Sequence, residues 1–86
     1  MKHYFLVRTS DSTYSGSYKF IAETFEEAEN FLKNNELDWY APKGTGSIFE
    51  VNQYMKELKR WYYFDGNCSE IFDYEKGDYL KVWTIK

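Results

Sequence analysis

His3 and Cys68 are the residues of this chain best suited to nucleophilic or metal chemistry, and each is the only residue of its type. A nucleophilic thiol needs a base within hydrogen-bond reach, and a structural zinc site needs several Cys or His ligands. Cys68 has no histidine near it in the sequence, and one cysteine cannot form an internal disulfide. We therefore predict no catalytic residues, no metal site and no cofactor, with Cys68 as an unreactive, partly buried thiol.

Acidic residues are the next candidates for chemistry. Five of them fall in the last third of the chain, at Asp65, Glu70, Asp73, Glu75 and Asp78. A glycosidase-type carboxylate pair needs a deep cleft, and 86 residues are few to build one. The sequence "GTG" at 44–46 could present backbone N–H groups to an anion, but the lysine and spacing of a phosphate-binding loop are absent. Neither feature predicts an enzyme.

Aromatic residues are the most distinctive part of the composition, at 22% of the chain. Four occur in succession in "KRWYYFDGNC", which spans 59–68. Aromatic rings among basic residues can stack on single-stranded bases, and the candidates are Lys59, Arg60, Trp61, Tyr63, Lys81 and Trp83. Because such binding depends on phosphate neutralisation, a net charge of −3 disfavours it. Single-stranded nucleic-acid binding is therefore the alternative function.

The elements that must carry these side chains predict an α+β fold in a single domain covering residues 1–86. We expect an antiparallel sheet of about five strands, made of an N-terminal hairpin (2–9 and 18–23) and a C-terminal three-stranded meander, packed with one or two helices. Thr24 and Glu27 form a capping box, which predicts a helix from 24 onward. Its apolar stripe consists of Phe25, Ala28, Phe31 and Leu32.

A second helix is expected at about 48–58. Ser47 and Glu50 have the spacing of another capping box. Apolar residues follow at i, i+3, i+7 and i+10, namely Ile48, Val51, Met55 and Leu58. The β-branched and aromatic content also leaves a strand over 47–52 open as an alternative.

The meander determines which rings share a face. Asp65-Gly66 and Lys76-Gly77 are typical of two-residue hairpin turns. Alternation then places one set on one face: Tyr62, Phe64, Ile71, Leu80 and Val82. The other set comprises Trp61, Tyr63, Phe72, Tyr74, Tyr79, Lys81 and Trp83. We expect the aliphatic face to be the core; the reverse arrangement stays open, and a slip of one residue at one turn would break the grouping.

These features predict a small non-enzymatic protein-binding module. The expected partner-binding residues are aromatic or basic residues of the meander and acids of the first helix: Trp61, Tyr63, Tyr79, Lys81, Trp83, Glu26, Glu27 and Glu29. The partner would be another protein or a second copy in a homodimer. Phage or mobile-element inhibitors of a host nucleic-acid-handling or defence protein are one class of small acidic chains of this kind. With no long apolar run and no signal-peptide core, we expect a cytoplasmic protein without membrane contact.

Overall fold

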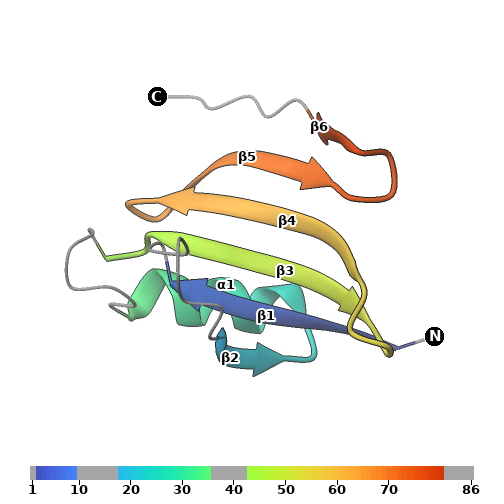
Figure 1. Cartoon of the computed structure of the whole chain (residues 1–86). Helices are drawn as coiled ribbons and strands as arrows, with labels where there is room; N and C mark the ends of the chain where they lie inside the picture. The colour runs from blue at the N-terminus through green and yellow to red at the C-terminus, as the bar shows by residue number, and fades with distance from the viewer. Residues whose placement is uncertain (1, 10–17, 36–42, 81–86) are drawn as a thin grey trace.

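A computed structural model describes residues 2–9, 18–35 and 43–80 of this protein. Six antiparallel strands form one sheet in the order β2-β1-β3-β4-β5-β6 (Figure 1). The elements, in chain order, are β1 (His3–Thr9), β2 (Tyr18–Ala22), α1 (Phe25–Asn34), β3 (Gly46–Asn52), β4 (Glu57–Phe64), β5 (Asn67–Asp73) and β6 (Asp78–Leu80). The predicted α+β class, N-terminal hairpin and C-terminal meander are confirmed, with six strands instead of about five.

The helix α1 begins where the capping box predicts. Thr24 has an extended backbone, and its hydroxyl oxygen accepts a hydrogen bond from the backbone N–H of Glu27 at 3.2 Å. At the other end, the side-chain amide of Asn35 donates to the carbonyl of Phe31 at 2.8 Å, which satisfies one of the unpaired carbonyls of the last turn. Cap residues therefore fix both ends of this ten-residue helix.

The main core lies between α1 and the half of the sheet made by β2, β1 and β3, on which the helix packs. Ala28 and Leu32 of the helix are fully buried against Val7 of β1 and Ile48 of β3. Partly buried rings surround this cluster, and Phe20 stacks on Phe31 with ring centroids 4.2 Å apart. In Figure 1, α1 lies behind β1, so the opposite face of the sheet is turned toward the viewer. We call the side that carries α1 the helix face.

The helix predicted at 48–58 is wrong, and the alternative strand is correct. Residues Gly46–Asn52 form β3, which pairs with β1 on one side and β4 on the other. Ser47 lies within this strand and caps no helix. Its hydroxyl oxygen accepts a hydrogen bond from Nε of Arg60 at 3.1 Å instead. Ile48 and Val51 pack in two clusters on opposite faces of the sheet. Their i, i+3 spacing reflects a strand with two apolar faces, not one face of a helix.

The two predicted meander turns have different outcomes. Asp65 and Gly66 both have positive φ, as a type I′ turn requires, and Phe64 pairs with Asn67. The second turn has four residues, because Asp73 pairs with Asp78. The carboxylate of Asp73 organises it by accepting hydrogen bonds from two backbone N–H groups at 2.9 and 3.2 Å. The observed turn is two residues longer than the predicted one. Because side chains alternate between the faces with a period of two, this difference does not alter which residues share a face.

Gly44 joins the start of β3 to the β4–β5 turn. It has a φ of +83°, and its carbonyl accepts a hydrogen bond from the N–H of Gly66 at 3.0 Å. A Cβ at this position would lie 2.7 Å from the backbone nitrogen of Gly66, whereas a Cβ at Gly66, with a φ of +82°, would meet nothing within 4 Å. The two positions share the same backbone strain but differ in space.

We predict that Gly44→Ala destabilises the protein more than Gly66→Ala. Positive φ costs both variants about 1–2 kcal/mol, and the steric clash adds roughly 1–3 kcal/mol for Gly44→Ala alone. Urea unfolding followed by circular dichroism measures both free energies of unfolding. Equal losses would show that the close approach to Gly66 contributes nothing.

Candidate functional site

The structure separates the residues predicted to bind a partner. Trp61 and Tyr63 lie on the helix face and pack against the main core, where Tyr63 is only 5% exposed. Tyr79 pairs with Phe72, which in turn pairs with Arg60, so Tyr79 lies on the opposite face and is 55% exposed. The prediction that Trp61, Tyr63 and Tyr79 share one surface is therefore wrong. Lys81 and Trp83 lie outside the described residues.

One β-bulge causes this separation. Phe64 pairs with Asn67 at the turn, but Tyr63 pairs with Cys68 and Tyr62 pairs with Glu70. Ser69 is thus an extra residue in β5, and it reverses the faces of every residue beyond it. As a result Ile71, which pairs with Trp61, and Leu80, which pairs with Ile71, lie on the helix face. Tyr62 and Phe64 alternate with Trp61 and Tyr63 along β4 and lie on the other face. The prediction that Tyr62, Phe64, Ile71 and Leu80 share one face, opposite Trp61, is therefore wrong.

Trp61 fills the gap between the helix and the middle of the sheet. Its ring centroid lies 4.8 Å from that of Phe25 in α1 and 6.4 Å from that of Phe5 in β1. Tilted contacts of this kind typically add about 0.5–1.5 kcal/mol per pair to the hydrophobic contribution. The described surroundings of Trp61 therefore account for it as a core residue.

Tyr63 joins the sheet to the acidic helix. Its hydroxyl donates a hydrogen bond to Oε2 of Glu29 at 2.8 Å, and the same oxygen lies 3.4 Å from Nζ of Lys33. Burial raises the pKa of Tyr63 well above its usual range, and the Glu29 carboxylate raises it further because it would repel a phenolate. Of the three predicted acids, Glu29 is thus engaged within the fold, while Glu26 and Glu27 are exposed in the first turn of α1.

The opposite side of the sheet, which we call the arginine face, contains a second core. Leu6, Phe49 and Val51 are each 1% exposed there, although α1 lies on the other side. The described side chains packed against this cluster are aromatic, namely Tyr4, Tyr18 and Tyr74. Tyr18 meets Phe49 edge-on with ring centroids 5.7 Å apart. Strand side chains with apolar bodies and polar tips therefore cover this face.

Two guanidinium groups complete the cover over Phe49. Cζ of Arg8, in β1, lies 5.1 Å from the centroid of the Phe49 ring, and Cζ of Arg60, in β4, lies 4.6 Å from it. Arg8 also lies 5.1 Å from the ring of Tyr18, and Arg60 lies 4.2 Å from the ring of Tyr62. Arginine suits this position because its planar, weakly hydrated cation stacks on rings.

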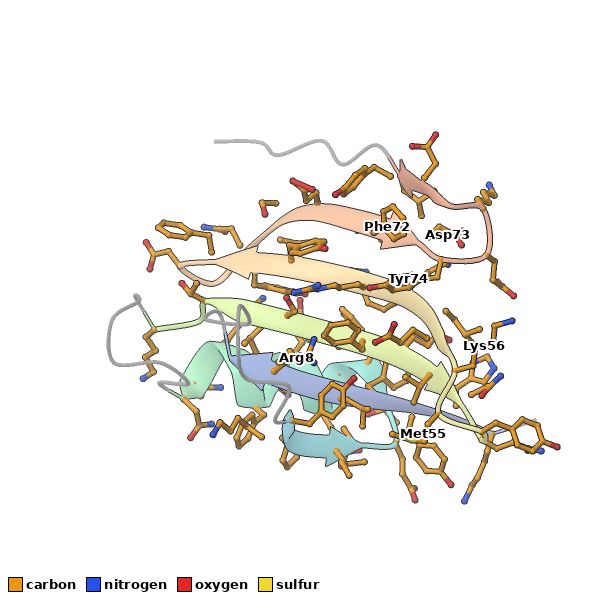
Figure 2. All side chains as sticks on the ribbon, viewed as in Figure 1. Arg8, Met55, Lys56, Phe72, Asp73 and Tyr74 are labelled. Atoms are coloured by element: carbon orange, nitrogen blue, oxygen red, sulfur yellow. The ribbon has the colours of Figure 1, made fainter. Side chains whose placement is uncertain are left out.

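A group of aromatic rings extends this surface toward the β6 edge. Phe72 contacts Tyr74 and Tyr79 edge-on, each at a centroid distance of 4.9 Å. Figure 2 shows Phe72 and Tyr74 at the end of β5, and Arg8 on the same side of the sheet toward β1. Tyr79 is more than half exposed. The arginine face is therefore buried at its centre and more accessible toward β6.

Among the described strand residues, pairing places charges of both signs on the arginine face. Arg8 and Arg60 are cations, while Glu57 lies opposite Val51 and Glu70 opposite Tyr62. Before β1, Nζ of Lys2 lies 5.9 Å from the centroid of the Tyr4 ring, which packs on the same face. Burial raises the pKa of Tyr18, and the negative charge of the neighbouring Glu57 carboxylate raises it further. Burial also raises the pKa values of Tyr62 and Tyr74. These tyrosines are thus neutral hydrogen-bonding groups at physiological pH.

The sequence analysis missed Arg8 and identified Arg60 only as part of a nucleic-acid site. A signal was present, because the chain has eleven basic residues and only these two are arginines. Lysine would provide the charge without the planar group that stacks on rings. An arginine within an aromatic strand of a lysine-rich chain therefore indicates a stacked position.

Two findings bear on the residues that were considered for metal and thiol chemistry. Within them, no three His, Cys, Asp or Glu side chains gather as a metal site would require. Burial raises the pKa of the Cys68 thiol, which disfavours the reactive thiolate. Among the described helices, none has the length and apolar character to cross a membrane. The chain matches no protein-family model, no curated protein and no solved structure.

The raised pKa of Tyr63 predicts how stability depends on pH. A tyrosine that keeps its proton in the folded state but loses it near pH 10 when unfolded stabilises the fold below that pH. This contribution disappears as pH rises above 10, so the free energy of unfolding should fall between pH 9 and 11. Tyr63→Phe should lose roughly 1–2 kcal/mol at pH 7 and show a shallower fall.

Urea unfolding of both proteins across this pH range measures the difference. Tyr79→Phe serves as the matched control, because Tyr79 is exposed and its side chain lies on the other face. If the free energies of unfolding of the original protein and Tyr63→Phe fall in parallel with pH, the protonation of Tyr63 does not contribute to the pH dependence of stability.

Proposed function

We propose that this protein is a small non-enzymatic protein-binding module whose contact surface is the arginine face. The observation that supports the proposal best is the composition of this surface: two arginines and a series of tyrosine and phenylalanine rings lie on the side of the sheet opposite α1. Tyrosine and arginine are among the residues that most often dominate the binding energy of protein interfaces. Lysine, which interfaces disfavour, occupies the other nine basic positions of the chain.

The local charge favours a protein over a polyanion. Glu57 and Glu70 offset much of the positive charge that Arg8, Arg60 and Lys2 bring to this face, and the whole chain carries a net charge of −3. Nucleic-acid affinity comes largely from neutralised phosphates, which needs an excess of positive charge. Binding to a folded protein whose surface carries charges of both signs does not require an excess of positive charge.

The exposed acids of α1 form a second, smaller part of the proposal. Glu26 and Glu27 lie in the first turn of the helix, on the other side of the sheet from the arginine face. A basic groove in a nucleic-acid-handling or defence protein of a host cell is the kind of surface that they would complement. Inhibition of such a protein in the cytoplasm, by a phage or mobile-element product, is the biological role that we infer from this pairing.

Single-stranded nucleic-acid binding is the second candidate. One observation favours it: guanidinium groups and rings alternate across the arginine face, with Arg60 over Tyr62 and Phe49. Bases can stack on such rings whatever their sequence. Binding of this kind would be opposed by repulsion between the phosphates and the carboxylates of Glu57 and Glu70.

We expect the original protein, tagged at its N-terminus, to retain a partner from lysate of its source cells, and the double variant Tyr79→Ala, Phe72→Ala to lose it. Loss of exposed and half-buried rings removes hot-spot contacts, each of which typically contributes more than about 1 kcal/mol. Mass spectrometry of the retained fraction and sedimentation velocity of the purified protein distinguish a foreign partner from a second copy.

The matched control is Lys33→Ala, Asn34→Ala, which changes two exposed residues at the end of α1. The proposal requires that this variant retains the partner. Equal retention by all three proteins, or a partner that nuclease removes, would contradict protein binding through the arginine face.

A further inference from the structure

Both arginines of this protein lie over the same ring. Arg8 and Arg60 are 52 positions apart (60 − 8), and strand pairing brings both beside Phe49, at 5.1 and 4.6 Å from its centroid. Phe49 pairs directly with Leu6 on β1 and with Arg60 on β4, while Arg8 lies two pairs along the β1–β3 ladder, opposite Ser47 and on the same face. Triangle geometry therefore limits the separation of the two Cζ atoms to less than about 10 Å, the sum of these two distances.

Arg60 is held in one orientation by several contacts. Its Nε donates to the Ser47 hydroxyl oxygen at 3.1 Å. The rings of Phe49 and Tyr62 lie against it. A guanidinium group has five N–H donors, so this hydrogen bond leaves others to bind a ligand without further loss of side-chain freedom.

Arg8 is held by rings rather than by hydrogen bonds. Its guanidinium lies between the rings of Tyr18 and Phe49, at 5.1 Å from each centroid. Its Nε is buried and has no hydrogen-bond partner among the described residues. A buried donor without a partner is unfavourable, because it has lost its hydrogen bonds to water. The position therefore fixes a cation in place at a cost to stability.

Neither arginine is neutralised by a carboxylate of the described residues. The ion pairs in that part of the chain are His3–Glu50 and Lys33–Glu29, both elsewhere. Strand pairing places two acids on the same face, with Glu57 opposite Val51 and Glu70 opposite Tyr62, and neither forms an ion pair with Arg8 or Arg60. Within the described residues, the face thus presents two cations without a direct carboxylate partner.

We propose that Arg8 and Arg60 together form a site for carboxylate side chains of an acidic segment in the partner protein, with the rings of Tyr62 and Phe72 beside it as the apolar contact. This inference rests on the proposed function and names the chemistry of the partner. Guanidinium groups bind carboxylates through paired, charge-assisted hydrogen bonds, which restrict both position and orientation.

Carboxylates fit this site better than phosphates do. Each carboxylate carries a single negative charge, and two of them would match the two arginines. A phosphate backbone would continue past the arginines toward Glu70 and Glu57, which lie on the same face. Like charges brought together in an interface cost several kcal/mol. The site therefore selects a short acidic segment over a polyanion.

The two arginines make the test direct, because the protein labelled with ¹⁵N should give only two arginine Nε–H signals. The probe is a short peptide that alternates glutamate and serine, compared with a peptide of the same length that alternates glutamine and serine. We expect the glutamate peptide to shift both signals in a saturable way and the glutamine peptide to shift neither. Equal shifts with the two peptides, or none with either, would overturn the proposal.

Variants test whether the planar group itself is needed. Arg8→Lys and Arg60→Lys keep the charge, and each should lower the affinity for the glutamate peptide about tenfold, because lysine cannot form the paired hydrogen bonds. Lys33→Gln removes a charge from the end of α1 and should leave the affinity unchanged. Circular dichroism checks that each variant folds. If a variant does not fold, the titration of the unsubstituted protein with the two peptides still tests the proposal. An equal loss in Lys33→Gln would show attraction by net charge only.

Two further results separate this inference from the proposed function. A single-stranded oligothymidine that shifts the arginine signals at lower concentration than the glutamate peptide would overturn the carboxylate site in favour of phosphate binding. Retention of the cellular partner by both arginine variants, together with its loss in Tyr79→Ala, Phe72→Ala, would overturn the carboxylate site and leave protein binding through this face intact.

Discussion

Within the described part of the chain, one helix packs on a sheet that is wider than the helix can cover. Ten residues make α1 about 15 Å long, and it packs only on β2, β1 and β3. Six strands spaced about 4.8 Å apart span roughly 24 Å. Among the described residues, side chains of the strands and their turns therefore cover the helix face beyond β3 and the centre of the arginine face. The high aromatic content of the chain follows from this constraint, because rings cover the most area per residue.

The two faces meet this requirement in different ways. On the helix face, Trp61 and Tyr63 extend the core beyond the reach of α1, and Tyr63 is tied back to the helix through Glu29. On the arginine face, Phe49 is buried beneath Arg8 and Arg60. Flat groups with polar edges cover apolar surface while remaining compatible with water. The bulge at Ser69 decides which rings serve which face, because it reverses the side chains of β5 and β6 relative to β4.

Local signals in the sequence predicted much of the fold. The capping box at Thr24, the Asp65-Gly66 turn and the alternation in the strands all reflect interactions between near neighbours, and the structure confirms them. The strand β3 was predicted as a helix because a strand with two apolar faces loses its alternation. The bulge at Ser69 has no residue pattern that marks it, so the grouping of Trp61 with Tyr79 failed. The pairing of Arg8 with Arg60 needs the strand order, which no local signal provides.

A face that covers its own apolar centre is also well prepared to bind. Arg60 already has a fixed orientation through Ser47, Tyr62 and Phe49, so a partner would not have to restrain it again. No described carboxylate pairs with it, so a partner's acid would not have to displace one. The same contacts that shelter Phe49 therefore reduce two of the usual costs of association. In the function that we propose, stability and recognition would depend on the same side chains, and lysine would lack the planar group that both roles use.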